Sequence, residues 1–221
     1  MENLIVPILG CLMLCSAESV QEPLRELKSG GHLLGETAQQ FFSEGAVGEL
    51  LRACEARDWK SVRQLAKAVD QTLKPNTKDI CAKALLLKQQ ALGGSRQEHP
   101  GGDKETMRTD TFTLDGGRLV RIDVVYSTPH ADVEGYHSKS YAELFAGLRE
   151  AYGEPSKSYS ETVLDTYGAK YEARRAVWMG KLDVISIIEQ PGVNARIEII
   201  AETVAEHNRA AQAPKATNPL Q

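Results

Sequence analysis

The sequence lacks the short motifs that identify the common classes of enzyme. It contains no G-x-S-x-G turn for a nucleophilic serine, no phosphate-binding P-loop and no G-x-G-x-x-G dinucleotide fingerprint. It also has no C-x-x-C pair, which excludes the usual thiol redox motif and the zinc knuckle. These absences favour a protein that is not an enzyme and that carries no cofactor.

Clustered positive charge is also missing. The chain has 26 Lys and Arg residues against 30 Asp and Glu residues, which gives a formal net charge of -4 at pH 7. Its longest basic run is Arg174 and Arg175 with Lys170 nearby, which we interpret as solvated positions on a strand. A nucleic-acid partner would require a positive patch, and we predict none.

No apolar run is long enough to cross a bilayer, which takes about 20 residues in a helix. The longest run, Leu4 to Cys15, covers twelve positions and is broken only by one Pro and one Gly. Such a run, followed by the small Ala17, is typical of the hydrophobic part of a secretory signal peptide. We therefore predict a signal peptide over residues 1–17 and export to the bacterial periplasm or beyond, with no stable membrane span after its removal.

Two other locations remain open. Residues 1–3 carry no Lys or Arg, which a signal peptide normally has at its start. A cytoplasmic protein in which this apolar run is a buried strand or helix is therefore one alternative. The residues before Cys11 also resemble a lipoprotein cleavage box, which would give a protein anchored by a lipid on Cys11.

The chain has four cysteines, and two of them fall within the predicted signal peptide. The mature chain would keep Cys54 and Cys81. An even pair of cysteines in an oxidising compartment is expected to form a disulfide. The alternative is two reduced thiols that pack as small hydrophobic groups.

The first half of the chain is predicted to be helical. Residues 18–36 are polar and contain a Gly-Gly pair, so we expect a flexible lead-in. Between 37 and 93 the apolar residues recur at helical spacing, in antiparallel helices with a break near Gly45. Residues 94–106 are rich in Gly and charge without periodicity and are predicted to be a linker.

The second half, 107–203, alternates apolar and polar residues as half-buried strands do. One helix is predicted inside it, over 140–152, where Ser140 and Glu143 form the S-x-x-E pattern of a capping box. The segment 154–169 is too long for an ordinary connection, so we allow for an extra edge strand around 162–167. Residues 204–221 are predicted to be a disordered tail.

The expected fold is therefore α+β. N-terminal antiparallel helices precede an antiparallel sheet of about five strands, and one helix is inserted after the first hairpin. Consecutive strands joined by tight turns must be antiparallel.

Two stretches of sequence carry a resemblance to known proteins. The helix residues and the hairpin from Trp178 to Ile188 resemble small, uncharacterised exported bacterial proteins, through Tyr141, Leu144, Leu148, Tyr152, Gly153 and Pro155. The run Leu34-Gly35-Glu36-Thr37 before a helix is similar to the opening of BamE-like and beta-lactamase-inhibitor-like lipoprotein domains. The resemblance implies helices on an antiparallel sheet and a periplasmic, non-catalytic protein that binds another protein.

The strongest candidate for a metal-binding or catalytic site is the loop at 130–137, between a predicted strand and the predicted helix. Within eight residues it carries His130, Asp132, Glu134 and His137, which are suitable ligand types for zinc or a similar divalent ion. Their spacing matches no established metal motif, so a plain solvated loop is the competing interpretation. In an enzyme built here, Glu134 would be the base for a metal-activated water.

Two main functions follow from these observations. In the first, the protein is an exported binding or scaffold module that engages an envelope or secreted partner through the polar face of the sheet or an exposed edge strand. In the second, it is a metal-dependent hydrolase centred on the loop at 130–137. A cytosolic helical adaptor follows only if the N-terminus is not a signal peptide.

Overall fold

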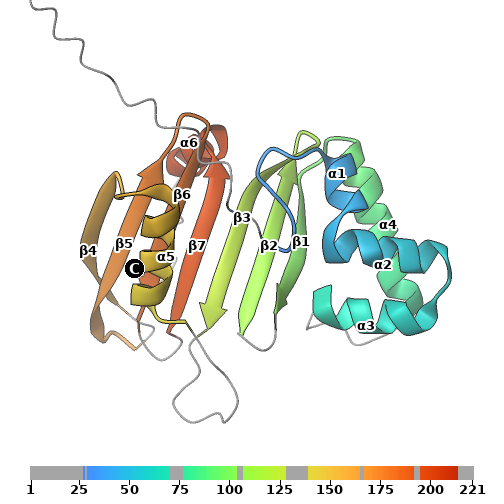
Figure 1. Ribbon diagram of the computed structural model, residues 1–221, viewed down its shortest axis with the longest axis horizontal. Coiled ribbons are helices and arrows are strands. Elements are labelled where there is room, and N and C mark those ends of the chain that lie inside the picture. The colour runs from blue at the N-terminus through green and yellow to red at the C-terminus, as the bar shows by residue number, and fades with distance from the viewer. Residues whose placement is uncertain are drawn as a thin grey trace, which may run out of the picture.

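The computed structural model describes residues 27, 29–69, 77–103, 107–127, 139–164, 167–191 and 195–213. Within these residues six helices accompany one antiparallel sheet of seven strands (Figure 1). The predicted α+β class is therefore confirmed. No described helix combines the length and the apolar character that crossing a membrane would require.

The sheet consists of two meanders that meet in its middle. Its order is β1-β2-β3-β7-β6-β5-β4, so β1 to β3 form one meander, β4 to β7 form the other, and β3 pairs with β7. The strands are β1 (Gln97–Asp103), β2 (Arg108–Asp115), β3 (Arg118–Ser127), β4 (Lys157–Leu164), β5 (Lys170–Met179), β6 (Asp183–Gln190) and β7 (Arg196–Thr203).

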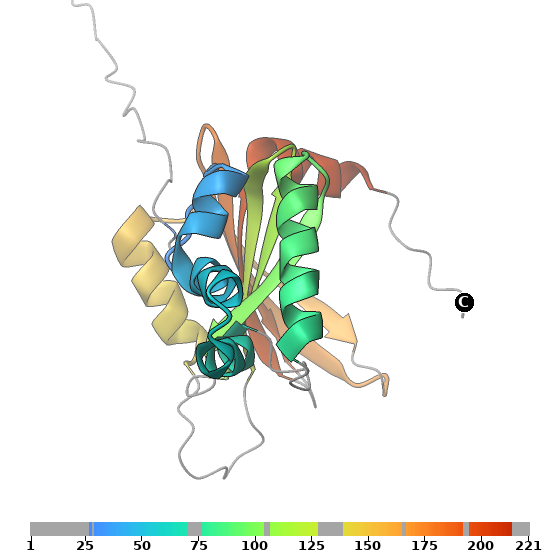
Figure 2. The same cartoon turned by 90° about the vertical axis from the view of Figure 1, so that its right-hand side faces the viewer.

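Five helices cover one face and one edge of the sheet, and α6 crosses the end of the other face. Figure 1 shows α5 across the second meander and α1 to α4 grouped at the β1 edge, and Figure 2 shows that α1 and α5 lie on the same side. The helices are α1 (Ala38–Ser43), α2 (Gly45–Glu55), α3 (Trp59–Val69), α4 (Thr77–Leu92), α5 (Tyr141–Tyr152) and α6 (Val204–Gln212).

Helices α1 and α5 both begin with a capping box. The Thr37 hydroxyl accepts from the backbone N–H of Gln40 at 3.3 Å before α1, and Ser140 accepts from Glu143 at 3.3 Å before α5. Both caps satisfy backbone donors that the first helical turn leaves free. The predicted helix at 140–152 and its cap are thus confirmed.

The main hydrophobic core fills the space between the sheet and helices α1, α2 and α5. It takes the inward residues of both meanders, so the two halves share one core. Burying each large aliphatic side chain contributes about 1.5–3 kcal/mol. At the end of α5, the Trp178 indole N–H donates to the Gly153 carbonyl at 2.9 Å and ties that helix to β5. The residues of this core with no exposed surface are Phe41, Ala91, Leu114, Leu119, Ile122, Ala176, Ile185, Ile187 and Ala201.

A second apolar cluster lies among helices α2, α3 and α4 and contains the two mature cysteines. The Sγ atoms of Cys54 and Cys81 are 2.00 Å apart, which is the geometry of a disulfide, as predicted. This disulfide joins α2 to α4. The cluster consists of Leu50, Ala53, Cys54, Val62, Ala66, Ile80 and Cys81, with Leu65 packed against it.

The prediction of about five strands was wrong, because two further strands lie in segments without strand patterns. β1 occupies the predicted linker at 94–106. Its sequence has no β-branched residue. It is a strand because its seven residues pair with seven of the eight residues of β2. Gly102 suits this site, since its φ is +145° and a Cβ there would lie 2.4 Å from the Arg108 carbonyl oxygen.

The second additional strand is β4, an edge strand within 154–169. It begins at Lys157 and ends at Leu164, earlier than the edge strand expected around 162–167. Because β1 precedes the predicted hairpin, the inserted helix α5 follows a three-stranded meander. The break predicted near Gly45 is confirmed, because α1 ends at Ser43 and α2 begins at Gly45.

The predicted flexible lead-in and disordered tail were also wrong in part. In the lead-in at 18–36, Ser29 and His32 are 2 % and 1 % exposed because they pack against β2 and α1. In the tail at 204–221, residues 204–212 form α6, whose cap is the Thr203 hydroxyl accepting from Glu206 at 3.2 Å. Ion pairs to the sheet, described below, hold this polar helix in place.

Candidate binding surface on the open face of the sheet

The face of the sheet opposite the helical layer is the largest candidate site. Strand register places three rows of side chains on this open face, running across the sheet from β4 or β5 to β1 or β2. No described helix except α6 lies over it (Figure 2). We define the open face by Glu98, Thr109, Thr111, Thr113, Arg121, Asp123, Val125, Lys157, Tyr159, Glu161, Arg175, Val177, Met179, Val184, Ser186, Ile188, Glu198, Ile200 and Glu202.

The apolar side chains in the middle of the open face, which we call its apolar centre, are those of Val125, Val177, Ile188 and Ile200, and across the strands they alternate with Ser186 and Glu198. Val125, Val177 and Ile188 are half-buried there, and Ile200 is 9 % exposed. Charged side chains flank this centre on both sides, with Arg175 towards β4 and Asp123 and Arg121 towards β1. An apolar centre inside a charged rim is the usual anatomy of a protein interface.

A groove of about 550 Å³ runs beside α6 at one end of the open face. The sheet supplies its floor, and α6 forms a wall through Arg209, Ala210 and Ala213. Three arginines and four carboxylates line it: Arg96, Arg121, Arg209, Glu98, Asp123, Glu198 and Glu206. The groove is thus polar and of mixed charge.

Ion pairs between α6 and the sheet shape this groove. Arg96, just before β1, donates two hydrogen bonds to the Glu206 carboxylate, at 2.7 and 3.2 Å. Arg209 pairs with Asp115 at 2.6 Å and with Glu206 at 3.1 Å. The hydrogen bonds and charge of Arg96 lower the pKa of Glu206, which is 4 % exposed, so this carboxylate stays ionised.

Arg121 on β3 is the central cation of the open face. It contacts Asp123 at 2.6 Å and Glu202 of β7 at 2.9 Å, so it joins the two meanders. Burial opposes its charge, but the hydrogen bonds to Asp123 and the nearby carboxylates raise the pKa of Arg121 overall. Glu202 also contacts His207 of α6, at 2.8 Å.

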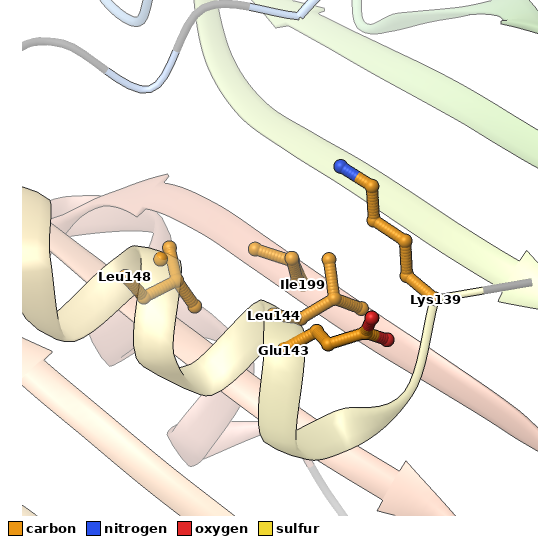
Figure 3. Close-up of a pocket in the computed structure, with 6 residues that line it drawn as sticks. Lys139, Glu143, Leu144, Leu148 and Ile199 are labelled. Atoms are coloured by element: carbon orange, nitrogen blue, oxygen red, sulfur yellow. The ribbon is translucent and has the colours of Figure 1, made fainter.

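Two hollows flank α5 on the helical face. The inner one, about 260 Å³, has an aliphatic floor of Leu144, Leu148 and Ile199, and Lys139 extends past them at its rim (Figure 3). Glu143 also lies beside this hollow. Its carboxylate accepts hydrogen bonds from the backbone N–H and the hydroxyl of Ser140 in the capping box. The outer hollow, about 370 Å³, lies between α5 and β4. Neither hollow brings together groups for catalysis.

The predicted metal-binding loop, with His130, Asp132, Glu134 and His137, lies outside the described residues. Within the residues that are described, no group of three or more His, Cys, Asp or Glu could hold a metal ion. The metal site therefore remains a prediction.

Two other histidines lie in the interior of the protein. His32 and His99 are 1 % and 3 % exposed, in an aromatic cluster with Phe41 and Phe112. Arg174 and Arg175, the longest basic run, point to opposite faces and pair with Glu189 and Glu161.

The groove residues were not identified from the sequence, because no local motif contains them. Arg96 fell in a predicted linker and Glu206 in a predicted tail, and 110 positions separate them. The alternation along β3 did place Arg121 and Asp123 together on a polar face. Alternation along β7 likewise places Glu198 and Glu202 on one face.

The chain was compared with known proteins: no family model, curated protein or solved structure matches it significantly.

Proposed function

We propose that this chain is an exported, non-catalytic binding module that engages another protein through the open face of its sheet. One observation carries this proposal. Helices cover one face of the seven-stranded sheet, whereas of the described helices α6 alone borders the opposite face, on which the register gathers Val125, Val177, Ile188 and Ile200. Apolar side chains inside a polar rim are a feature of protein interaction sites.

The charge pattern of the open face supports a protein partner over a small anionic or cationic ligand. The arginines of the groove already contact carboxylates of the same chain, at 2.6–2.9 Å for Arg121 and at 2.7 Å for Arg96. These groups are therefore held in fixed positions and largely neutralised. A partner would gain most of its binding free energy from the apolar centre, while the rim charges would set orientation and specificity.

Export is supported by two features together. The apolar run before Ala17 predicts a signal peptide, and the Cys54–Cys81 pair has disulfide geometry, which persists in oxidising compartments. The intact mass of the protein from its native host tests this. We expect a chain beginning at Glu18 whose two cysteines react with an alkylating reagent only after reduction. A full-length chain with four reactive thiols would contradict export.

Site-specific photo-crosslinking tests the binding proposal. A photoreactive residue at Val125, in the apolar centre, is compared with one at Glu150, which is exposed on α5. In the cells that make the protein, we expect one defined adduct from position 125 and none from position 150. Mass spectrometry of the adduct identifies the partner.

A second variant measures the contribution of the apolar centre. With the identified partner, Val125→Glu should weaken binding at least tenfold, because it places a charge where an apolar contact forms. Glu150→Lys serves as the control and should leave the affinity unchanged. Equal crosslinking from both positions, or an unaltered affinity of Val125→Glu, would contradict the use of this face.

A further inference from the structure

The two outer edges of the sheet differ in how they are protected. At β1, helices α3 and α4 pack against the strand, and Pro100 has no backbone N–H to offer a further strand. At the opposite edge, no described helix lies beyond β4 (Figure 1). An open strand edge presents unpaired N–H and C=O groups, to which another strand can pair.

β4 is also unusually regular for an open edge. Its eight residues pair with β5 without a bulge, and none is Pro or Gly. Six of the eight are exposed. Natural proteins block such edges with bulges, prolines or repelling charges. The only charges on β4 are Lys157 and Glu161, which have opposite sign.

The sequence of β4 is self-complementary about Tyr159. The segment reads Lys157-Ser158-Tyr159-Ser160-Glu161, so the two charges lie at equal distances on either side. When two copies pair antiparallel about a two-fold axis at Tyr159, Lys157 of one copy faces Glu161 of the other. The same contact repeats at the other end, and Ser158 faces Ser160.

The neighbouring pairing registers do not place Lys157 of one copy opposite Glu161 of the other. An axis at Ser160 places Tyr159 opposite Glu161 and leaves Lys157 opposite Val163. An axis at Glu161 brings two glutamates together, and like charges directly opposite are destabilising. The axis at Tyr159 is the arrangement that pairs both charges.

The side chains on both faces of β4 are compatible with this strand pairing. Lys157, Tyr159 and Glu161 lie on the open face, where the Lys157 ammonium is 4.7 Å from the Tyr159 ring centroid and Glu161 contacts Arg175 at 2.5 Å. On the other face, the small Ser158 and Ser160 border the hollow of about 370 Å³ beside α5.

We propose that two copies of this chain form a homodimer by antiparallel pairing of their β4 strands about a two-fold axis at Tyr159. The two seven-stranded sheets then continue into each other, and both open faces lie on the same side. The dimer would form through the backbone edge of β4 and would leave Val125, Ile188 and Ile200 of the open face uncovered. A single strand pair with few side-chain contacts is a small interface, so the dimer dissociates on dilution.

Sedimentation velocity over a range of concentrations tests the proposal through charge exchange. The unaltered chain should show a concentration-dependent monomer–dimer equilibrium. Lys157→Glu and Glu161→Lys should each weaken dimerisation at least tenfold, because each places like charges opposite each other. The double variant K157E/E161K should restore it. An equimolar mixture of the two single variants should also form dimers, because opposite charges again face each other.

A matched charge exchange far from β4 is the control. Lys88 and Glu55 form a solvent-exposed ion pair of 3.8 Å between α4 and α2. Lys88→Glu and Glu55→Lys should leave the dimer unchanged, and circular dichroism should show that every variant is folded. A monomer at all concentrations, dimers that persist in both single variants, or no rescue in the mixture would each overturn the proposal. A monomer that instead binds an extended peptide along β4 would overturn it as well.

Discussion

His99 shows how burial alters a single ionisable group. Its ring is 3 % exposed, and among the described residues its Nε2 has no hydrogen-bond partner. Burial, assisted by the neighbouring His32, lowers the pKa of His99 from 6.5 to about 4. The folded protein therefore holds this imidazole neutral at a pH where an unfolded chain would protonate it.

This difference predicts a loss of stability in mild acid. Between pH 6.5 and 4 the unfolded chain binds a proton on His99 that the folded chain does not, so the free energy of unfolding falls as the pH falls. We expect a loss of about 2 kcal/mol from this group between pH 7 and pH 5, from its two pKa values. Urea unfolding at a series of pH values measures it.

The variant His99→Leu provides the comparison for this prediction. It replaces the titrating imidazole by an apolar side chain of similar size in the aromatic cluster. Its stability should depend much less on pH between 6.5 and 5 than that of the parent chain. An identical pH dependence in both proteins would show that another group is responsible.

At the scale of elements, α6 depends on charge more than on apolar packing. Its main buried residue is Glu206, held by Arg96 at 2.7 Å and Arg209 at 3.1 Å. A buried carboxylate that loses its partner costs more than the pair contributes, because its desolvation is no longer offset. The ion pairs thus position the helix that walls the groove.

The substitution Arg96→Ala should therefore loosen α6. We expect the free energy of unfolding to fall by about 1–3 kcal/mol and protease cleavage within 204–213 to become faster. Arg149→Ala is the control, since Arg149 pairs with Glu154 at 3.6 Å on the exposed surface and should cost less than about 0.5 kcal/mol. Equal effects of the two substitutions would show that Arg96 has no special role.

Elements were predictable where local patterns suffice. The apolar stripe and capping box of α5 predicted that helix, and alternation in β3 predicted a strand with one polar face. β1 was missed because its sequence carries no strand pattern, and α6 was missed because, although Thr203 and Glu206 have the spacing of a helix cap, the segment has few large apolar residues. β1 is a strand through pairing with β2, and α6 is held by residues as far away as Arg96.

The same reason limits what the sequence says about the candidate site. The polar residues of β3 were placed on one face, but Glu202, the partner of Arg121, lies 81 positions away along the chain and in turn contacts His207 of α6. The openness of that face depends on where all six described helices pack. Neither property is encoded in a local motif.

At the scale of the whole molecule, the sheet shares one core with parts of α1, α2, α4 and α5, and a second, smaller apolar cluster lies among α2, α3 and α4. Ile122 of the first meander and Ile187 of the second belong to the same core, so the two meanders stabilise each other. The cluster around Cys54 and Cys81 is separate from that core. The disulfide thus acts on a small apolar cluster that is too limited to be strongly stable alone.

Removing the disulfide should therefore loosen the helices before the sheet. For the double variant Cys54→Ala/Cys81→Ala, we expect helices α2 to α4 to lose about 3–4 kcal/mol, because the unfolded chain is no longer constrained by a loop of this length. Amide hydrogen exchange should accelerate in α2, α3 and α4 and stay unchanged in β3, β6 and β7. Reduction of the parent chain should give the same pattern. If exchange instead accelerates equally in the sheet, these helices and the sheet unfold together, and the helices are part of the cooperative structure that presents the open face.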